Sequence, residues 1–142
     1  MNINIDLTKS GSVQNNMISM GNLTGTTSWY SDIEIYHCSN LDVSHNTLLV
    51  TGGSSLFRGS IYLNASATTT LFTPVGNQIQ NNIIVNSGTG SAIHAETIAT
   101  PGVFFASDYN VYFGNSTTVL AYGALGTGYN TISGWNLATG QD

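Results

Sequence analysis

The sequence predicts an all-β fold, a parallel β-helix of about four to five coils, and two columns of repeated residues carry this prediction. The first column is an asparagine shared by four similar segments: VQNNMI at 13–18, VSHNTL at 43–48, IQNNII at 79–84 and SDYNVY at 107–112. These asparagines are Asn16, Asn46, Asn82 and Asn110, at intervals of 30, 36 and 28 residues. Apolar and polar residues alternate after each asparagine, which favours strands stacked in coils over paired helices.

The second column is an isoleucine that begins a short aliphatic alternation. It comprises Ile3, Ile33, Ile61 and Ile93, at intervals of 30, 28 and 32 residues. The two columns run in step, so each repeat predicts one strand around the isoleucine and another after the asparagine. We therefore expect the four isoleucines to stack in one buried column, as equivalent side chains do in a solenoid.

The asparagine column predicts a bend between two strands. A residue at such a bend must tolerate the left-handed region, and an Asn side chain can also bond the equivalent Asn one coil away. GYNTIS adds a weaker fifth copy at Asn130. Calcium or sugar binding by the amide oxygens is the alternative, but the chain has no Gly-Gly-x-Gly-x-Asp unit of the calcium-binding kind.

Composition agrees with one β-rich domain over residues 1–142. Only 6% of the 142 residues are charged and 16 are Gly, whereas helical proteins draw heavily on Glu and Lys. Disorder is the alternative for a chain rich in Asn, Ser and Thr, but low charge and regularly placed Ile and Val argue against it.

Several segments resemble a known family. The NN-x-I and HN-x-L signatures resemble the right-handed parallel β-helix repeats of the pectate lyase superfamily. FFASDYNVYF at 104–113 and ISGWNLATGQD at 132–142 are similar to the C-terminal region of bacterial β-helix proteins, which are usually secreted polysaccharide lyases or glycoside hydrolases. The resemblance implies a right-handed β-helix, truncated relative to the family, with residues 131–142 as a C-terminal cap in which Trp135 covers the open end of the core.

Charge and cysteine content exclude several functions. A net charge of −5, with Lys9 and Arg58 as the two cations, argues against nucleic-acid and anionic-membrane partners. The segment MNINIDLTKSG lacks the charged and apolar regions of a signal peptide, so the localisation stays undetermined although the family is usually secreted. We expect no metal and no other cofactor. Cys38 is the single cysteine, and a dyad with His37 is disfavoured because neighbouring strand residues point to opposite faces.

The candidate site is the outward face of the isoleucine strands. If the isoleucines point inward, alternation turns a set of polar and aromatic residues outward, on strands about 4.8 Å apart. This set contains Asp6, Asp32, Glu34, Tyr36, Tyr62, Asn64, His94 and Glu96. Asp32, Tyr36, Tyr62 and Asn64 are the expected sugar-binding residues, because aromatic rings stack on sugars while amides and carboxylates bond hydroxyls.

Glu34, Glu96 and His94 are the candidate catalytic residues on this face. Two coils would separate Glu34 from Glu96 by roughly 9–10 Å, near the spacing of the carboxylate pair in inverting glycoside hydrolases. The alternative is a face that is merely polar and solvated. A polysaccharide lyase would need cations beside the substrate, and Lys9 and Arg58 both lie outside this face, so no lyase motif carries over.

Two functions remain open from the sequence. The first is a carbohydrate-interacting β-helix module, a fragment of a polysaccharide-degrading enzyme with no identifiable complete catalytic site, whose partner is a polysaccharide or oligosaccharide. If it is active, it is a glycoside hydrolase or a polysaccharide lyase. The alternative is a structural or assembly solenoid of the adhesin or tail-fibre type without enzymatic activity. Nothing precedes the first strand that could cover its unpaired backbone groups, so we also expect a homo-oligomer through the N-terminal coil.

Overall fold

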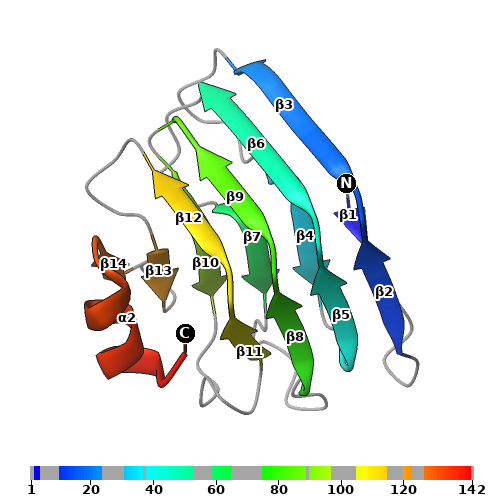
Figure 1. Cartoon of the computed structure of the whole chain (residues 1–142), viewed down its shortest axis with the longest axis vertical. Helices are drawn as coiled ribbons and strands as arrows, with labels where there is room; N and C mark the ends of the chain where they lie inside the picture. Colours follow the sequence, from blue (N-terminus) through cyan, green and yellow to red (C-terminus); the bar gives the residue numbers. More distant parts are fainter. Residues whose placement is uncertain are drawn as a thin grey trace.

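Three sheets of stacked strands make up the fold, as seen in a computed structural model of the chain (Figure 1). The structure describes residues 2–3, 10–23, 31–36, 38–52, 59–64, 75–88, 90–96, 105–114, 120–122 and 127–141. Within these ranges the strands recur in triplets, and each triplet gives one strand to each sheet. We call each triplet of consecutive strands a coil.

Every pair of neighbouring strands is parallel except the last pair of sheet 1. In spatial order, sheet 1 contains β1 (Asn2–Ile3), β4 (Ile33–Tyr36), β7 (Gly59–Asn64), β10 (Ser91–Glu96), β13 (Leu120–Tyr122) and β14 (Thr127–Tyr129). Sheet 2 contains β2 (Gly11–Gln14), β5 (Leu41–Ser44), β8 (Asn77–Gln80) and β11 (Phe105–Asp108). Sheet 3 contains β3 (Met17–Leu23), β6 (Thr47–Gly52), β9 (Ile83–Asn86) and β12 (Val111–Gly114). The predicted all-β class is confirmed at this level, as stacked parallel sheets consistent with a parallel β-solenoid.

The predicted asparagine ladder joins the coils at the bend between sheets 2 and 3. Asn46 accepts at Oδ1 from the backbone N and from Nδ2 of Asn16, both at 3.0 Å. Asn82 accepts in the same way from Asn46, and Asn110 from Asn82, again at 3.0 Å. Each coil therefore donates to the next one along the chain, and the ladder has a direction.

The left-handed conformation at this bend belongs to the residue before each ladder asparagine, which corrects the expectation that the ladder residue itself adopts it. These residues are Asn15, His45, Asn81 and Tyr109, with φ between 54° and 57°. A residue with positive φ turns the chain sharply. The asparagine that follows it can then point along the solenoid axis. Asn and His are common in this region, whereas the ring of Tyr109 makes it a costly choice there.

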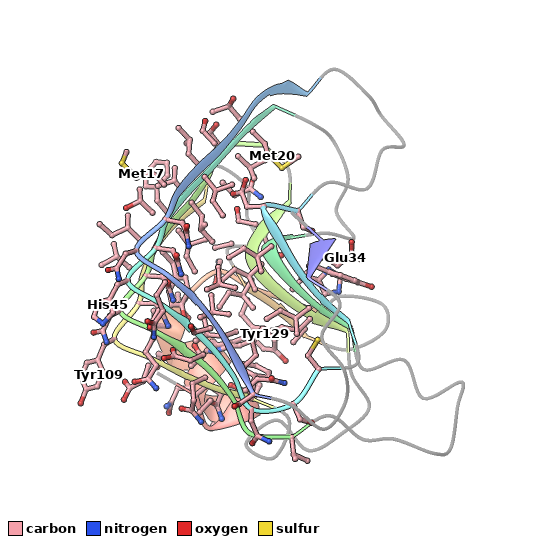
Figure 2. All side chains as sticks on the ribbon, turned by 90° about the vertical axis from the view of Figure 1, so that its right-hand side faces the viewer. Met17, Met20, Glu34, His45, Tyr109 and Tyr129 are labelled. Atoms are coloured by element: carbon pink, nitrogen blue, oxygen red, sulfur yellow. The ribbon has the colours of Figure 1, made fainter. Side chains whose placement is uncertain are left out.

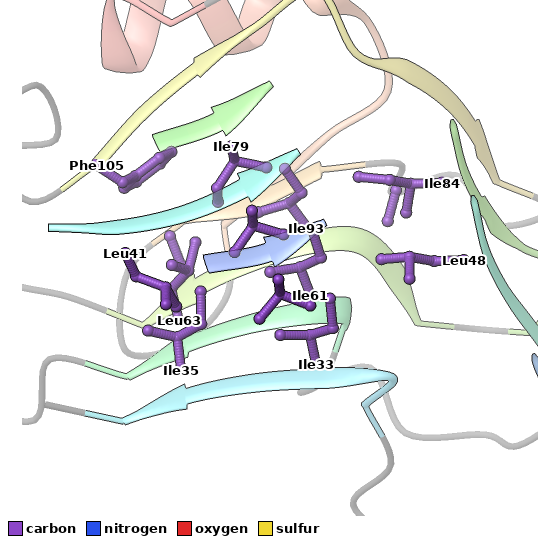
Figure 3. Packing of buried hydrophobic residues seen from close by; sticks show 14 of the residues in the cluster. Ile33, Ile35, Leu41, Leu48, Ile61, Leu63, Ile79, Ile84, Ile93 and Phe105 are labelled. Atoms are coloured by element: carbon purple, nitrogen blue, oxygen red, sulfur yellow. The ribbon is translucent and has the colours of Figure 1, made fainter. Parts of the chain in front are cut away.

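Aliphatic side chains from all three sheets meet between the sheets (Figure 3). Ile33, Ile61 and Ile93 pair in register and have no exposed surface, as the repeat pattern predicts. The first coil is different, because Ile3 pairs with Ile35 and not with Ile33. The prediction of a column of four isoleucines is thus wrong at Ile3, which is displaced by two residues along the strand.

The C-terminal segment departs from the repeat. β14 runs antiparallel to β13, and helix α2 (Ile132–Thr139) follows with Thr131 as N-cap and Gly140 as left-handed C-cap. Asn130 therefore precedes a helix and is not a fifth member of the ladder. Trp135 on α2 is fully buried, with its ring 6.2 Å from that of Phe105 and 5.9 Å from that of Tyr129. The helix covers the core beyond β11, while the division into one domain and a cap stays a prediction.

Among the described residues, no helix is long and apolar enough to span a membrane.

Candidate functional site

The outer face of β4, β7 and β10 carries the residues singled out from the sequence. Strand register sets Glu34, Tyr62 and His94 side by side in one column of three neighbouring strands. A second column, two residues further along the strands, contains Tyr36, Asn64 and Glu96. The pairing within each column agrees with the alternation read from the sequence. For the second column the structure describes the backbone positions.

This face is not the open, solvated surface that the sequence suggested. Tyr62 and His94 are each 1% exposed and Asp32 has no exposed surface, while Glu34 is partly exposed. Residues 32, 62 and 94 are sequence neighbours of the core isoleucines, and neighbouring residues of a strand point to opposite faces of the sheet. These three side chains are therefore buried on the outer face of sheet 1 and not in the hydrophobic core. Alternation correctly separated the two faces, but it carries no information about what covers the outer one.

The middle of the face is a contact between two rings. The centroids of Tyr62 and His94 lie 5.4 Å apart, and the ring planes meet at 82°, an edge-to-face arrangement. Such a contact fixes both side chains and contributes about 0.5–1.5 kcal/mol beyond the burial of area. A sugar ring cannot stack on Tyr62 as it stands in this structure, because that ring is already enclosed. Direct access to the column is through Glu34 (Figure 2).

Asp32 is the residue with the most perturbed acidity on this face. Burial raises the pKa of its carboxyl from 3.8 to about 7, because the ionised form loses its hydration. A carboxyl with this pKa carries its proton part of the time at neutral pH and can donate it. Carboxyl groups tuned in this way serve as general acids in enzymes, and they also occur in structural networks.

The carboxylate spacing differs from the one expected. Glu34 and Glu96 are two strands and also two residues apart, so their Cα atoms are separated by roughly 12 Å. This diagonal exceeds the 9–10 Å estimated for two coils alone. Asp32 and Glu34 are two residues apart in sequence and lie on the same side of the extended chain. Their Cα atoms are therefore about 7 Å apart.

Several predicted residues lie outside the described ranges. They are Asp6, Lys9, His37 and Arg58. Cys38 is described and is fully buried in the hydrophobic cluster, as a small core residue. In the part of the chain that the structure describes, no three His, Cys, Asp or Glu side chains approach closely enough to hold a metal ion.

Two further surfaces were missed by the sequence analysis. The outer face of sheet 3 is apolar and exposed, with Met17 89%, Ile83 48%, Val111 61% and Phe113 58% accessible. Its signal was that two or more apolar or aromatic residues directly follow Asn16, Asn82 and Asn110, where the expected alternation would make every second position polar. The outer face of sheet 2 is polar, with Gln14 donating to Asp42 and Gln80 donating to Gln78.

Comparison of the chain with protein-family models, with curated proteins and with solved structures finds no match.

Proposed function

We propose that this chain is a carbohydrate-interacting parallel β-helix module whose ligand meets the outer face of β4, β7 and β10. The observation that supports this most is the buried carboxyl of Asp32, with a pKa of about 7, on a face that also carries Glu34, Tyr62 and His94. Burying an ionised carboxylate costs free energy at neutral pH, and acids with a pKa near 7 are common at functional sites.

The ligand that fits this chemistry is a neutral saccharide. A net charge of −5 disfavours polyanionic chains, while carboxylates, an imidazole and amides bond hydroxyl groups well. Glu34 meets the ligand first because it is the partly exposed member of its column. Tyr36, Asn64 and Glu96 occupy the neighbouring column in the strand register.

If the module is catalytic, the reaction is glycoside hydrolysis by Asp32 and Glu34. Asp32 has no exposed surface, so this proposal requires that ligand binding uncovers it. Asp32 then donates its proton to the leaving oxygen, and Glu34 activates water on the other side of the sugar. Glu34 and Glu96, which lie in neighbouring columns of the same face, remain the alternative pair. His94 then orients Tyr62 through the edge-to-face contact and has no direct part in proton transfer.

The finer fold assignment belongs to this proposal. We infer a right-handed solenoid of four coils and part of a fifth, because crossovers between parallel strands of one sheet are right-handed in nearly all proteins. The proposed relation to the pectate lyase superfamily rests on the sequence segments alone.

A binding assay against neutral oligosaccharides tests the function. Glu34→Gln should weaken binding at least tenfold, while Asp42→Asn, a matched change on the outer face of sheet 2, should leave it unchanged. If one oligosaccharide is also cleaved, Asp32→Asn should abolish cleavage and retain binding. Absence of binding to every neutral saccharide at millimolar concentration would remove this proposal.

A structural or assembly solenoid is the second candidate. It is favoured by the apolar outer face of sheet 3, which a glycan-binding module does not need. The homo-oligomer through the N-terminal coil expected from the sequence belongs to this candidate. Sedimentation analysis tests it, because a strict monomer at about millimolar concentration would rule out a weak dimer of this kind.

A further inference from the structure

In the described part of the chain, the asparagine ladder ends at Asn16, whose side-chain oxygen accepts no hydrogen bond. In the next coils, Oδ1 of the asparagine accepts from both N and Nδ2 of the coil before it. Among the described residues, nothing donates to Oδ1 of Asn16, and the side chain is exposed. One step of the ladder is therefore open on this side.

The side-chain nitrogen of Asn16 also differs from those of the later ladder asparagines. In the later coils Nδ2 also reaches back to a carbonyl of the preceding coil, from Asn46 to Val13 O at 2.7 Å and from Asn82 to Val43 O at 2.9 Å. Asn16 Nδ2 instead bonds Gln14 O of its own coil at 2.9 Å. A local carbonyl thus stands in for the one that a preceding coil would supply.

Among the described residues, the strands beside Asn16 have few of the features that protect a sheet edge, although β2 has four residues and β3 has a register shift between Met20 and Leu23. β2 and β3 are the terminal strands of sheets 2 and 3, and β3 is seven residues long. Residues 11–23 contain no charged residue and no proline. Natural edge strands are usually short, charged or interrupted, because an unprotected edge pairs with another strand.

At the opposite end of the solenoid, sheets 1 and 2 are closed. Sheet 1 ends in the antiparallel strand β14, which reverses the chain. Gln141 accepts at Oε1 from the backbone N of Ser107 at 2.7 Å, so it occupies the edge of β11. Head-to-tail stacking of two copies would have to displace these groups, and two copies facing each other by their first coils would set one Asn16 acceptor against another.

We propose that the edge formed by β2, Asn16 and β3 binds an extended segment of another polypeptide chain in parallel, with an asparagine of that segment donating to Oδ1 of Asn16. The partner is a strand–bend–strand of the same kind as a coil of this fold. Its backbone extends sheets 2 and 3, and its asparagine continues the ladder. This inference is independent of the carbohydrate proposal, because it uses the end of the solenoid and not the outer face of sheet 1.

A synthetic peptide of residues 39–52 is the probe. In the intact chain this segment donates through Asn46 N and Nδ2 to Asn82 Oδ1, so it carries the required geometry. Binding of the labelled peptide to the intact chain is followed by fluorescence anisotropy, and a Kd of about 10–100 μM is expected for a short strand of this kind. The peptide with Asn46→Ala should bind at least tenfold more weakly.

Protein variants locate the binding edge. Ser19→Lys puts a charge on the edge strand and should weaken peptide binding at least tenfold. Leu49→Lys is the matched control, since Leu49 pairs with Ser19 one strand further in and its strand is already paired on both sides. Amide exchange in β2 and β3 should slow when the peptide is added.

The inference is overturned if the native and alanine peptides bind equally, or if neither binds at about 1 mM. It is also overturned if the two lysine variants weaken binding alike, or if the chain pairs with itself through β3 and the peptide does not compete. Exchange protection at β12 in place of β2 and β3 would likewise contradict it.

Discussion

Asn46 donates from Nδ2 to Oδ1 of Asn82 at 3.0 Å, and both side chains are 1% exposed. The same nitrogen also donates to Val13 O, and the Asn46 oxygen accepts two further bonds from Asn16. One amide thus connects three successive coils at a bend where backbone bonds, such as Thr47 N to Asn16 O, also join the coils. Because buried polar groups are costly when unpaired, this ladder specifies how the coils stack.

The first prediction concerns the ladder. Asn46→Ala should lower the free energy of unfolding by about 2–4 kcal/mol, because it removes the buried bonds from Asn46 Nδ2 to Val13 O and to Asn82 Oδ1. Denaturant unfolding followed by circular dichroism measures this. Asn16→Ala is the matched control at the exposed end of the ladder, where water replaces lost bonds, and it should cost less than about 1.5 kcal/mol. Equal losses would contradict a cooperative buried ladder.

The second prediction concerns the isoleucine column. Ile61 lies between Ile33 and Ile93 with no exposed surface, so Ile61→Asp should prevent folding by placing a charge in the core. Ile61→Val should fold and lose about 0.5–1.5 kcal/mol. Ile83→Asp, on the exposed outer face of sheet 3, should remain folded. A folded Ile61→Asp protein, seen by chemical-shift dispersion, would sink the proposed packing of this column.

Much of the fold could be predicted from the sequence because a solenoid repeats its constraints. The ladder asparagines and the inward isoleucines each recur about every thirty residues, so several copies support each assignment. The misplacement of Ile3 has a simple physical cause. A shift of two residues leaves every side chain on the same face, so alternation cannot detect it, whereas a shift of one would have been obvious.

The candidate site was less predictable for two reasons. Strand parity placed Glu34, Tyr62 and His94 in one column, but burial of the outer face depends on tertiary contacts that a period of two does not encode. Asn130 was misread because an asparagine before Thr-Ile-Ser fits a strand repeat as well as a helix start. Thr131 decides between them by accepting from Gly134 N at 3.1 Å as the N-cap of α2.

The third prediction concerns the close approach of β7 and β10. A Cβ at Gly59 would lie 2.6 Å from the backbone N of His94 and 2.8 Å from the carbonyl oxygen of Ile61. Backbone atoms cannot move aside cheaply, so Gly59→Ala should destabilise the protein by about 2–4 kcal/mol and disturb the Tyr62–His94 contact. Thermal unfolding and the aromatic circular dichroism signal measure the two effects.

Gly140 supplies the control for this substitution. Its φ is 71°, and an added Cβ would meet nothing within 4 Å. Gly140→Ala should therefore cost only the strain of a left-handed residue, about 1 kcal/mol, with no change in the aromatic signal. If Gly59→Ala proved no worse than Gly140→Ala, the spacing between β7 and β10 would not be as tight as described.

The last prediction concerns the pH dependence of stability through Asp32. Its pKa is raised to about 7 in the folded protein, against an ordinary value of 3.8, so the folded state holds the proton more tightly than the unfolded state. Stability from this group is therefore greatest below about pH 4 and falls as the pH rises to about 7, where the ionised carboxylate must be buried. At about 1.4 kcal/mol per pKa unit, the full loss is up to about 4 kcal/mol.

Asp32→Asn isolates that contribution from other titrating groups. The amide cannot ionise, so the difference in unfolding free energy between the variant and the parent chain should grow in favour of the variant between about pH 4 and pH 7 and then level off. Urea unfolding across this pH range measures the difference. A difference that stays constant with pH would mean that Asp32 keeps an ordinary acidity in the folded chain, which would remove both the proton donor and the main support for a functional outer face.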